Sequence, residues 1–298
     1  MEPYPRPDQL QRHDVEEMNS ISREIQDLYD ANTPLFTKDS IRKVGDKLDV
    51  FQKGTLDSGE ITLKGINGVD YKVFIDPPYH NSSPNQHLGC STWIIDYRSI
   101  QRFTTYRDRR SFYPREAYLP MVILACTREI EHNPKYEEKR PVFSTEGLSR
   151  VYQDAKRQWR TGEYQERLQM ALATIEVPFV LNKVVALALG PLKLGSGICD
   201  ASIDQHVLVS VIHSSLLQHG ILSVTSERYV QDPAYTQMDR DVLSSEGFTV
   251  LNDPQAFLVL DESSILVSIN PDIPVKQIVA DICRPGIIIW DKHDSQWW

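Results

Sequence analysis

Several polar and glycine-rich positions able to do chemistry directly follow short apolar runs in the last third of the chain. The segment Gly190-Pro-Leu-Lys-Leu-Gly195-Ser196-Gly197 follows the apolar run 184–189 and precedes a helical pattern. Backbone N–H groups in a turn between a strand and a helix can hold a phosphate or the polar end of a nucleotide. The spacing is neither G-x-G-x-x-G nor a Walker loop, and Asp200 and Asp204 would repel a phosphate unless they cap the helix. A plain connecting loop is the competing interpretation.

Asp232 ends the next expected strand, in the sequence VQDPAY. An acidic residue at this position often accepts hydrogen bonds from a ribose, usually about 20 residues after the glycine turn. The separation here is about twice that, and the long intervening loop and helix account for the difference. Asp232-Pro233 can equally start a turn, so both interpretations stay open.

A third group comprises Asn270 and Asp272 after a later strand and Asp291 at the end of the last strand. Ligands of open α/β sheets bind outside the carboxyl ends of the strands. We therefore expect these residues to border one crevice with the glycine turn and Asp232. The pattern assigns no catalytic group or metal ligand, because Ser196 lies outside a G-x-S-x-G motif. For His206 and His213, on one expected helix, a core or surface role is favoured.

Arginines alternate with aromatic residues over positions 97–116, and Arg107, Arg109 and Arg110 are the densest part of the run. Arginine beside an aromatic ring can hold phosphate and stack on bases, which makes RNA a conceivable ligand. The acidic residues Asp96 and Glu116 are close enough in sequence to pair with these arginines. An internally paired or solvated face is therefore favoured, and RNA binding ranks last among the functions considered.

The hydrophobic periodicity predicts the elements that position these groups. Residues 183–291 alternate between β-branched runs and amphipathic helices, which is typical of βαβ units and a mainly parallel sheet. The fold class expected is α/β, with a Rossmann-like sheet in the C-terminal part and an N-terminal α+β portion packed on it. The boundaries expected are a flexible arm over 1–13, an α+β region over 14–175 and the Rossmann-like domain over 176–298.

Within the α+β region, two amphipathic helices are expected near residues 15–29 and 37–53. A hairpin with its turn at Asn67-Gly68 should follow, and then a strand over 91–97. A further loop or strand region should run to Pro120, and one or two helices should span 141–175. Their common face is expected to include Leu148, Tyr152 and Trp159.

Composition limits the functional classes. The chain has 298 residues, a formal net charge of −9 and a hydrophobic fraction of 41%, which together predict a folded protein that does not adhere to nucleic acid or anionic membranes indiscriminately. The sequence shows neither a long apolar run nor a signal-peptide pattern, so we expect a cytoplasmic or nuclear protein that does not enter membranes. The four cysteines are far apart, which favours buried thiols over a disulfide scaffold or a zinc site.

The C-terminal segments resemble a known family. The runs VVALALGPL, ASIDQHVLVSVIHSSLL, QDPAYT, LSSEGFTVLNDPQAFLVLD and PVKQIVADICRPGIIIWD are similar to the Sensitivity to Red Light Reduced-like (SRR-like) domain, in particular to its fungal form. This resemblance implies a Rossmann-like domain in a regulatory protein, with links to light and circadian signalling, haem metabolism and the cytoskeleton, and it implies no established reaction. Gly190 and the run 232–235 match the family pattern. Pro271-Asp272-Ile273 stands where other members often have Pro-His-Cys, so chemistry that needs that His and Cys is absent or altered.

The function expected is that of a regulatory protein that binds a protein partner or a small nucleotide-like ligand, with no cofactor identified. The alternative is an enzyme with a nucleotide-bearing cofactor, namely an S-adenosylmethionine-type transferase. In that enzyme the segment from Gly190 to Gly197 would hold the polar end of the cofactor, and Asp232 would bind its ribose.

Overall fold

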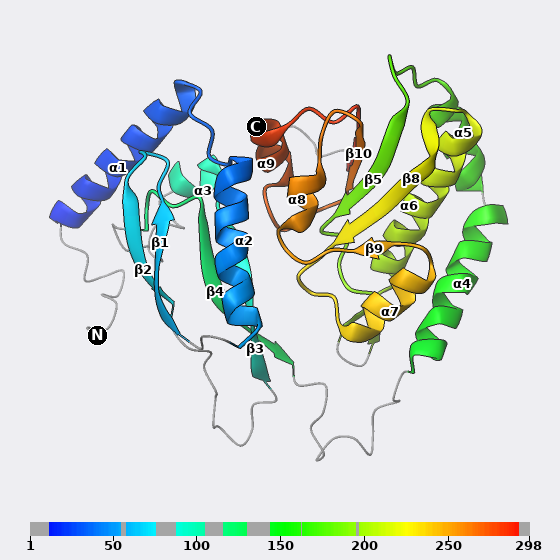
Figure 1. Cartoon of the computed structure of the whole chain (residues 1–298), viewed down its shortest axis with the longest axis horizontal. Helices are drawn as coiled ribbons and strands as arrows, with labels where there is room; N and C mark the ends of the chain where they lie inside the picture. The colour runs from blue at the N-terminus through cyan, green and yellow to red at the C-terminus, as the bar shows by residue number, and fades with distance from the viewer. Residues whose placement is uncertain are drawn as a thin grey trace. The chain divides into compact units, whose positions relative to one another are not determined.

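The computed structural model describes residues 12–54, 58–75, 88–104, 116–129, 144–161, 163–194 and 197–291 (Figure 1). The chain forms two compact units. The first contains residues 1–79, 91–127 and 276–282, and the second contains residues 80–90, 128–275 and 283–298. Most of the flexible arm expected over residues 1–13 lies outside the described residues.

Two helices begin the first unit, as the periodicity predicted: α1 (Arg12–Asp30) and α2 (Lys38–Gln52). Thr37 caps α2, because its side chain accepts from the Ser40 backbone N–H while the Ser40 side chain accepts from the Thr37 backbone N–H. One face of α2 is buried; its members are Ile41, Val44, Gly45, Leu48 and Phe51. A short helix, α3 (Ile100–Thr104), lies later in this unit.

Two separate two-stranded sheets complete the N-terminal part of the chain. β1 (Gly59–Lys64) and β2 (Asp70–Ile75) form the predicted antiparallel hairpin, with Gly68 in left-handed backbone conformation at the turn. β3 (Leu88–Tyr97) pairs with β4 (Met121–Glu129). The sequence interpretation did not extend to β4. Its start is continuously apolar and buried instead of alternating, so the two-residue period of a half-exposed strand is missing there.

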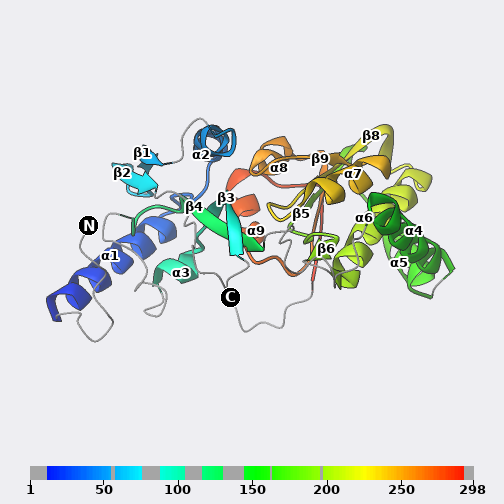
Figure 2. The ribbon, with the colours of Figure 1, turned by 90° about the horizontal axis from the view of Figure 1, so that it is seen from below.

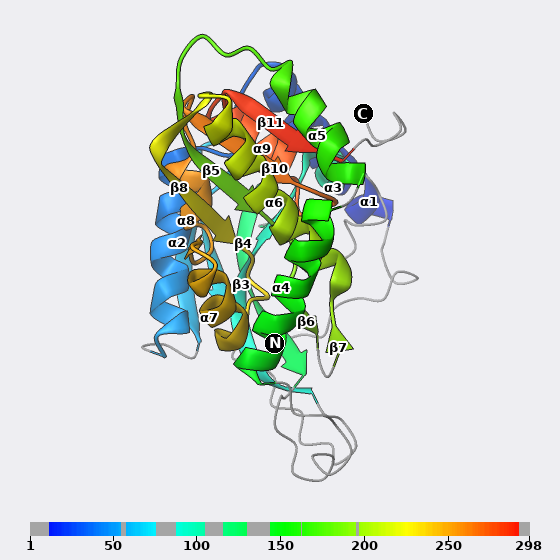
Figure 3. The ribbon, with the colours of Figure 1, turned by 90° about the vertical axis from the view of Figure 1, so that its right-hand side faces the viewer.

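The second unit contains the predicted parallel sheet, in the order β11-β10-β5-β8-β9 (Figures 1 and 3). Its strands are β5 (Leu181–Leu187), β8 (Leu222–Gln231), β9 (Thr249–Val250), β10 (Ser264–Ser268) and β11 (Ile287–Trp290). All neighbouring pairs are parallel. Every residue of β10 is buried, as expected for a parallel strand covered on both faces.

Helices precede and connect these strands along the chain. They are α4 (Thr145–Thr161), α5 (Glu163–Ala173), α6 (Asp200–Gln218), α7 (Gln237–Ser245), α8 (Gln255–Val259) and α9 (Val275–Ile282). The expected helices over 141–175 are thus present as α4 and α5, whereas α8 was not anticipated. α4 and α5 both contact α6, and Figures 2 and 3 show the three helices together on one side of the sheet.

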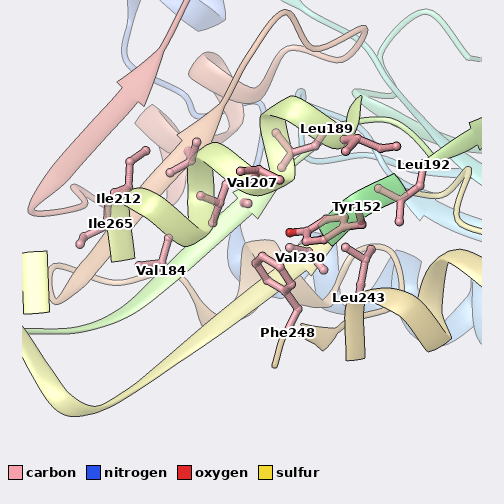
Figure 4. Packing of buried hydrophobic residues seen from close by; sticks show 14 of the residues in the cluster. Tyr152, Val184, Leu189, Leu192, Val207, Ile212, Val230, Leu243, Phe248 and Ile265 are labelled. Carbon is pink, nitrogen blue, oxygen red and sulfur yellow. The ribbon is translucent and has the colours of Figure 1, made fainter. Parts of the chain in front are cut away.

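One hydrophobic cluster joins α4, α5, α6 and α7 to the sheet (Figure 4). Leu148 and Tyr152 of α4 are fully buried and belong to the same cluster as Val184 of β5 and Val207 of α6. The boundary expected at residue 176 falls in the loop between α5 and β5. Because α4 and α5 share the core of the sheet, their packing links them to the second unit.

Candidate functional site

The strand order places a topological switch point between β5 and β10. The chain leaves β5 toward β8 on one side and leaves β10 toward β11 on the other. Ligands of doubly wound sheets bind beyond the carboxyl ends of the strands at such a point. Two non-glycine residues with left-handed backbone lie directly beyond these strands: Ala188 (φ 55°) after β5 and Asn270 (φ 50°) after β10. The buried Ser268 hydroxyl donates to the Leu187 carbonyl at 3.0 Å and holds the two strand ends together.

The glycine turn after β5 is more ordered than the plain loop considered from the sequence. Gly190 has φ 76°, and a Cβ atom there would lie 2.6 Å from the Ser202 hydroxyl oxygen, so both conformation and space require glycine. The turn continues into a small antiparallel ladder of β6 (Lys193–Leu194) and β7 (Gly197–Ile198). The predicted site residues Gly195 and Ser196 lie outside the described residues.

Asp232 lies at the end of β8, as predicted, but its carboxylate faces the protein backbone. One oxygen accepts from the Gly190 N–H at 2.8 Å and the other accepts from the Ala234 N–H at 2.8 Å. The side chain is buried. These contacts agree with the turn interpretation of Asp232, because its side chain stabilises the turn that it begins. The same side chain also fixes the glycine turn 42 residues earlier.

Asp239 is a second buried carboxylate with this role, and the sequence interpretation missed it. It accepts from the Leu192 N–H at 3.1 Å and from the backbone N–H and hydroxyl of Thr236 at 2.8 and 2.9 Å. Burial raises the pKa of its carboxyl above the ordinary value, and the hydrogen bonds oppose that shift. The spacing of Thr236 and Asp239, three residues apart before an apolar helical pattern, was the available signal, because it is typical of a helix capping box.

The loop after β10 forms the other side of the candidate site. The Asn270 N–H donates to the Asp291 carboxylate at 3.3 Å, so the structure brings these two predicted residues together. Asn270 and Asp272 are exposed, and Asp291 is half-buried. The predicted rim therefore consists of a turn held by buried carboxylates after β5 and a solvent-facing polar loop after β10.

His206 occupies the core, which agrees with the role favoured from the sequence. It is fully buried; Nδ1 lies 2.6 Å from the Ser202 carbonyl oxygen and Nε2 lies 2.7 Å from the Tyr235 hydroxyl. A carbonyl only accepts, so Nδ1 carries the proton of the neutral ring and Nε2 accepts from Tyr235. Full burial lowers the pKa of His206 to about 4. Both ring nitrogens thus form hydrogen bonds within the core, to the Ser202 carbonyl and the Tyr235 hydroxyl.

Two arginines of the arginine and aromatic segment are paired within the first unit. Arg98 is only 2% exposed; its Nε lies 3.2 Å from Asp96 and one terminal nitrogen lies 3.5 Å from Glu116. Arg102 contacts Asp96 at 2.5 Å. These contacts agree with the internally paired face favoured from the sequence. Arg107, Arg109 and Arg110, the predicted nucleic-acid contacts, lie outside the described residues.

Two of the four cysteines have side chains that the structure describes. The side chains of Cys199 and Cys283 carry thiols and are half-buried, which is less than the sequence interpretation expected, because each lies at the end of a helix. Within the residues described above, no group of three His, Cys, Asp or Glu side chains is placed to hold a metal ion. None of the helices in the described ranges has the length and apolar content needed to cross a membrane.

These features define a Rossmann-like domain with a polar rim at its switch point. Residues 168–295 match the family model described as the SRR1 domain. The match supports the SRR-like resemblance over the C-terminal part of the chain; α4 precedes the matched segment although it packs in the same core. Searches among curated proteins and among solved structures found no match.

Proposed function

We propose that this chain is a regulatory protein of the SRR-like type, in its fungal form, whose Rossmann-like domain binds a small polar ligand at the switch point without catalysing a reaction. The observation that carries the proposal is the pair of left-handed residues, Ala188 and Asn270, directly beyond the two strands of the switch point. Left-handed backbone costs a non-glycine residue free energy, less for Asn than for Ala, and strained residues cluster at active and ligand-binding sites. The expected cytoplasmic or nuclear location is part of the same proposal.

The contacts of the glycine turn narrow the chemistry of the ligand. A phosphate needs backbone N–H groups that are available to it. Here the N–H groups of Gly190 and Leu192 donate to Asp232 and Asp239, and Asp200 adds an acidic side chain to the first turn of α6. The exposed Asp272 adds a further carboxylate to the rim. We therefore propose a ligand that is uncharged or cationic and rich in hydrogen-bonding groups, in preference to a dinucleotide.

One observation favours an S-adenosylmethionine-type transferase as the alternative. Asp232 follows the second strand of the Rossmann order, where an acidic residue binds the ribose in proteins of this fold. The cationic sulfonium of S-adenosylmethionine would also suit an acidic rim. Against this alternative, both oxygens of Asp232 already accept backbone hydrogen bonds, so ribose binding would compete with the contacts that hold the turn.

A thermal-shift series on the purified chain tests the proposal. The probes are S-adenosylmethionine, adenosine, NAD, ATP and haem, because a ligand that binds only the folded state raises Tm. Asn270→Gly removes the amide side chain and retains access to left-handed backbone, and Asp272→Asn removes one rim charge. Glu262→Gln is the matched control, since Glu262 is exposed and precedes β10 at the opposite end of the strand.

We expect one of the uncharged or cationic probes to raise Tm by several degrees, and both rim variants to reduce that shift while Glu262→Gln retains it. A shift with S-adenosylmethionine alone, followed by methyl transfer, would favour the transferase. A flat series, or a shift that both rim variants leave intact, would contradict ligand binding at this rim.

A further inference from the structure

A second candidate surface lies at the opposite end of the parallel sheet from the rim. The chain leaves α5, runs through residues 174–180 and enters β5, so this connection lies at the amino-terminal end of the strand (Figure 1). Together with Gly220 and Ile221, which lie between α6 and β8, it lines a cavity of about 510 Å³. Ligand pockets usually have volumes of about 300–1,000 Å³. This end of the sheet therefore has space for part of a bound molecule.

Apolar side chains around this cavity face solvent. Phe179 and Val180, just before β5, are 45% and 59% exposed. Val224 is 92% exposed and lies two residues after Leu222, which pairs with Leu181 at the start of β5. Exposed apolar side chains that gather at one place mark interaction sites, whereas scattered ones need no explanation. Residues 175–180, 220–221 and 224 are called the amino-end groove below.

β8 carries extra residues at the position of Val224. Between the pairs Leu181–Leu222 and Lys183–Glu227, β5 has one residue and β8 has the four residues 223–226, so the register shifts there. An aliphatic side chain that is almost fully exposed contributes little to the stability of the sheet, because it buries hardly any apolar surface. A partner that covers Val224 would give this part of β8 a function.

The charges beside the amino-end groove distinguish between possible partners. The charged side chains of segments 174–180 and 220–227 are Glu176 and Glu227, and these segments contain no Lys or Arg. A second copy of the chain would bring like charges together at the groove, and the whole chain has a formal net charge of −9. An anionic membrane surface attracts basic segments and would repel this acidic one. A peptide with Lys or Arg beside apolar side chains is complementary to both features of the groove.

The backbone of the groove has donors that such a peptide can use. Within the described part of the chain, the N–H groups of Glu176, Val177 and Phe179 donate to no acceptor, whereas the Leu181 N–H donates to the Ile221 carbonyl at 2.9 Å. Extended peptides bind by hydrogen bonds to backbone groups of this kind, and pockets for their side chains give specificity. An extended conformation of the partner therefore fits the groove.

We propose that the amino-end groove binds an extended segment of a partner protein that carries apolar side chains beside a Lys or Arg. The apolar side chains would enter the cavity and cover Phe179, Val180 and Val224, and the basic side chain would pair with Glu176. The groove and the rim lie at opposite ends of the sheet, so this proposal does not depend on the ligand binding proposed above. It adds a surface for a protein partner to a domain whose rim faces a small ligand.

A library of short random peptides, displayed on phage and selected on the immobilised full chain, tests the proposal. Enriched peptides are synthesised, labelled and titrated by fluorescence anisotropy against the wild type and the variants Phe179→Ser, Val224→Ser and Glu176→Gln. Phe74→Ser is the matched control, because Phe74 is 53% exposed and lies on β2 in the first unit. All the replaced side chains are exposed, so every variant should fold, and measurement of Tm checks this.

We expect the selection to enrich peptides that combine apolar residues with Lys or Arg. Phe179→Ser should weaken their binding about tenfold, because a few buried anchors carry most of the binding energy of an interface. Val224→Ser and Glu176→Gln should weaken binding several-fold, and Glu176→Gln should also reduce its salt dependence. Phe74→Ser should keep the wild-type affinity.

Three results would overturn the proposal. The first is a selection without enriched peptides, or enriched peptides whose binding Phe179→Ser and Glu176→Gln leave unchanged. The second is self-association of the wild type in sedimentation that Phe179→Ser abolishes, which would assign the groove to a second copy of the chain. The third is binding to phosphatidylserine vesicles that Phe179→Ser abolishes, which would assign the groove to a membrane surface.

Discussion

The two loops that flank the switch point differ in how they are held. The turn after β5 is fixed from within: Asp232 and Asp239 accept its backbone N–H groups, and Ser202 fills the space beside Gly190. The loop after β10 exposes Asn270 and Asp272 and has one backbone contact to Asp291. Residues predicted together as one rim therefore have different roles. The first loop provides a rigid wall, and the second provides groups that a ligand can reach.

Replacement of Gly190, in the turn after β5, should give the largest loss in the free energy of unfolding. Gly190→Ala should lower the free energy of unfolding by about 2–4 kcal/mol, because left-handed backbone costs an L-residue about 1–2 kcal/mol and the crowding of a methyl group against Ser202 adds to it. Gly220→Ala is the matched control, since Gly220 also has positive φ (68°) but has no atom within 4 Å of an added Cβ. Urea unfolding of both variants measures the difference. Equal losses would show that the space beside Gly190 is not restricted.

The buried side chain of His206 should make the free energy of unfolding depend on pH. The pKa of His206 is about 4 in the folded protein against 6.5 for the free side chain, so the unfolded chain binds a proton first as pH falls. The contribution of neutral His206 to the free energy of unfolding is therefore complete above pH 6.5 and decreases between pH 6.5 and 4. The total decrease is about 3 kcal/mol. Urea unfolding across this range should show the decrease, and His206→Gln should lack that part of it. An NMR titration midpoint of His206 near 6.5 would contradict the assignment.

The two aspartates of the rim provide the sharpest single comparison. Asp232→Ala should cost about 2 kcal/mol, because the N–H groups of Gly190 and Ala234 lose a charged acceptor in a buried position. Asp272→Ala should change the free energy of unfolding by less than about 0.5 kcal/mol, since Asp272 is exposed. Thermal and urea unfolding of the two variants measure both losses in the free energy of unfolding. Comparable costs for the two substitutions would break the distinction between a rigid wall and an accessible loop.

Local patterns in the sequence determined most of the secondary structure. β-Branched runs between amphipathic helices predicted the parallel sheet, and the Asn67-Gly68 pair predicted the hairpin of β1 and β2. These predictions succeeded because the period of buried side chains and the conformational needs of turns are set by residues close in sequence. Local patterns did not predict β4 or α8. The start of β4 is uniformly apolar, and α8 is only five residues long.

The order of residues along the chain also predicted which side chains follow the strands, and thus the membership of the candidate rim. The roles of these side chains depend on contacts between segments that are far apart in the sequence. Asp232 and Asp239 reach N–H groups 42 and 47 residues away, His206 reaches Tyr235 29 residues away, and Asp281 reaches Phe36 245 residues away. No periodicity records such pairs, because a buried carboxylate takes whichever N–H group the packing of distant elements leaves beside it.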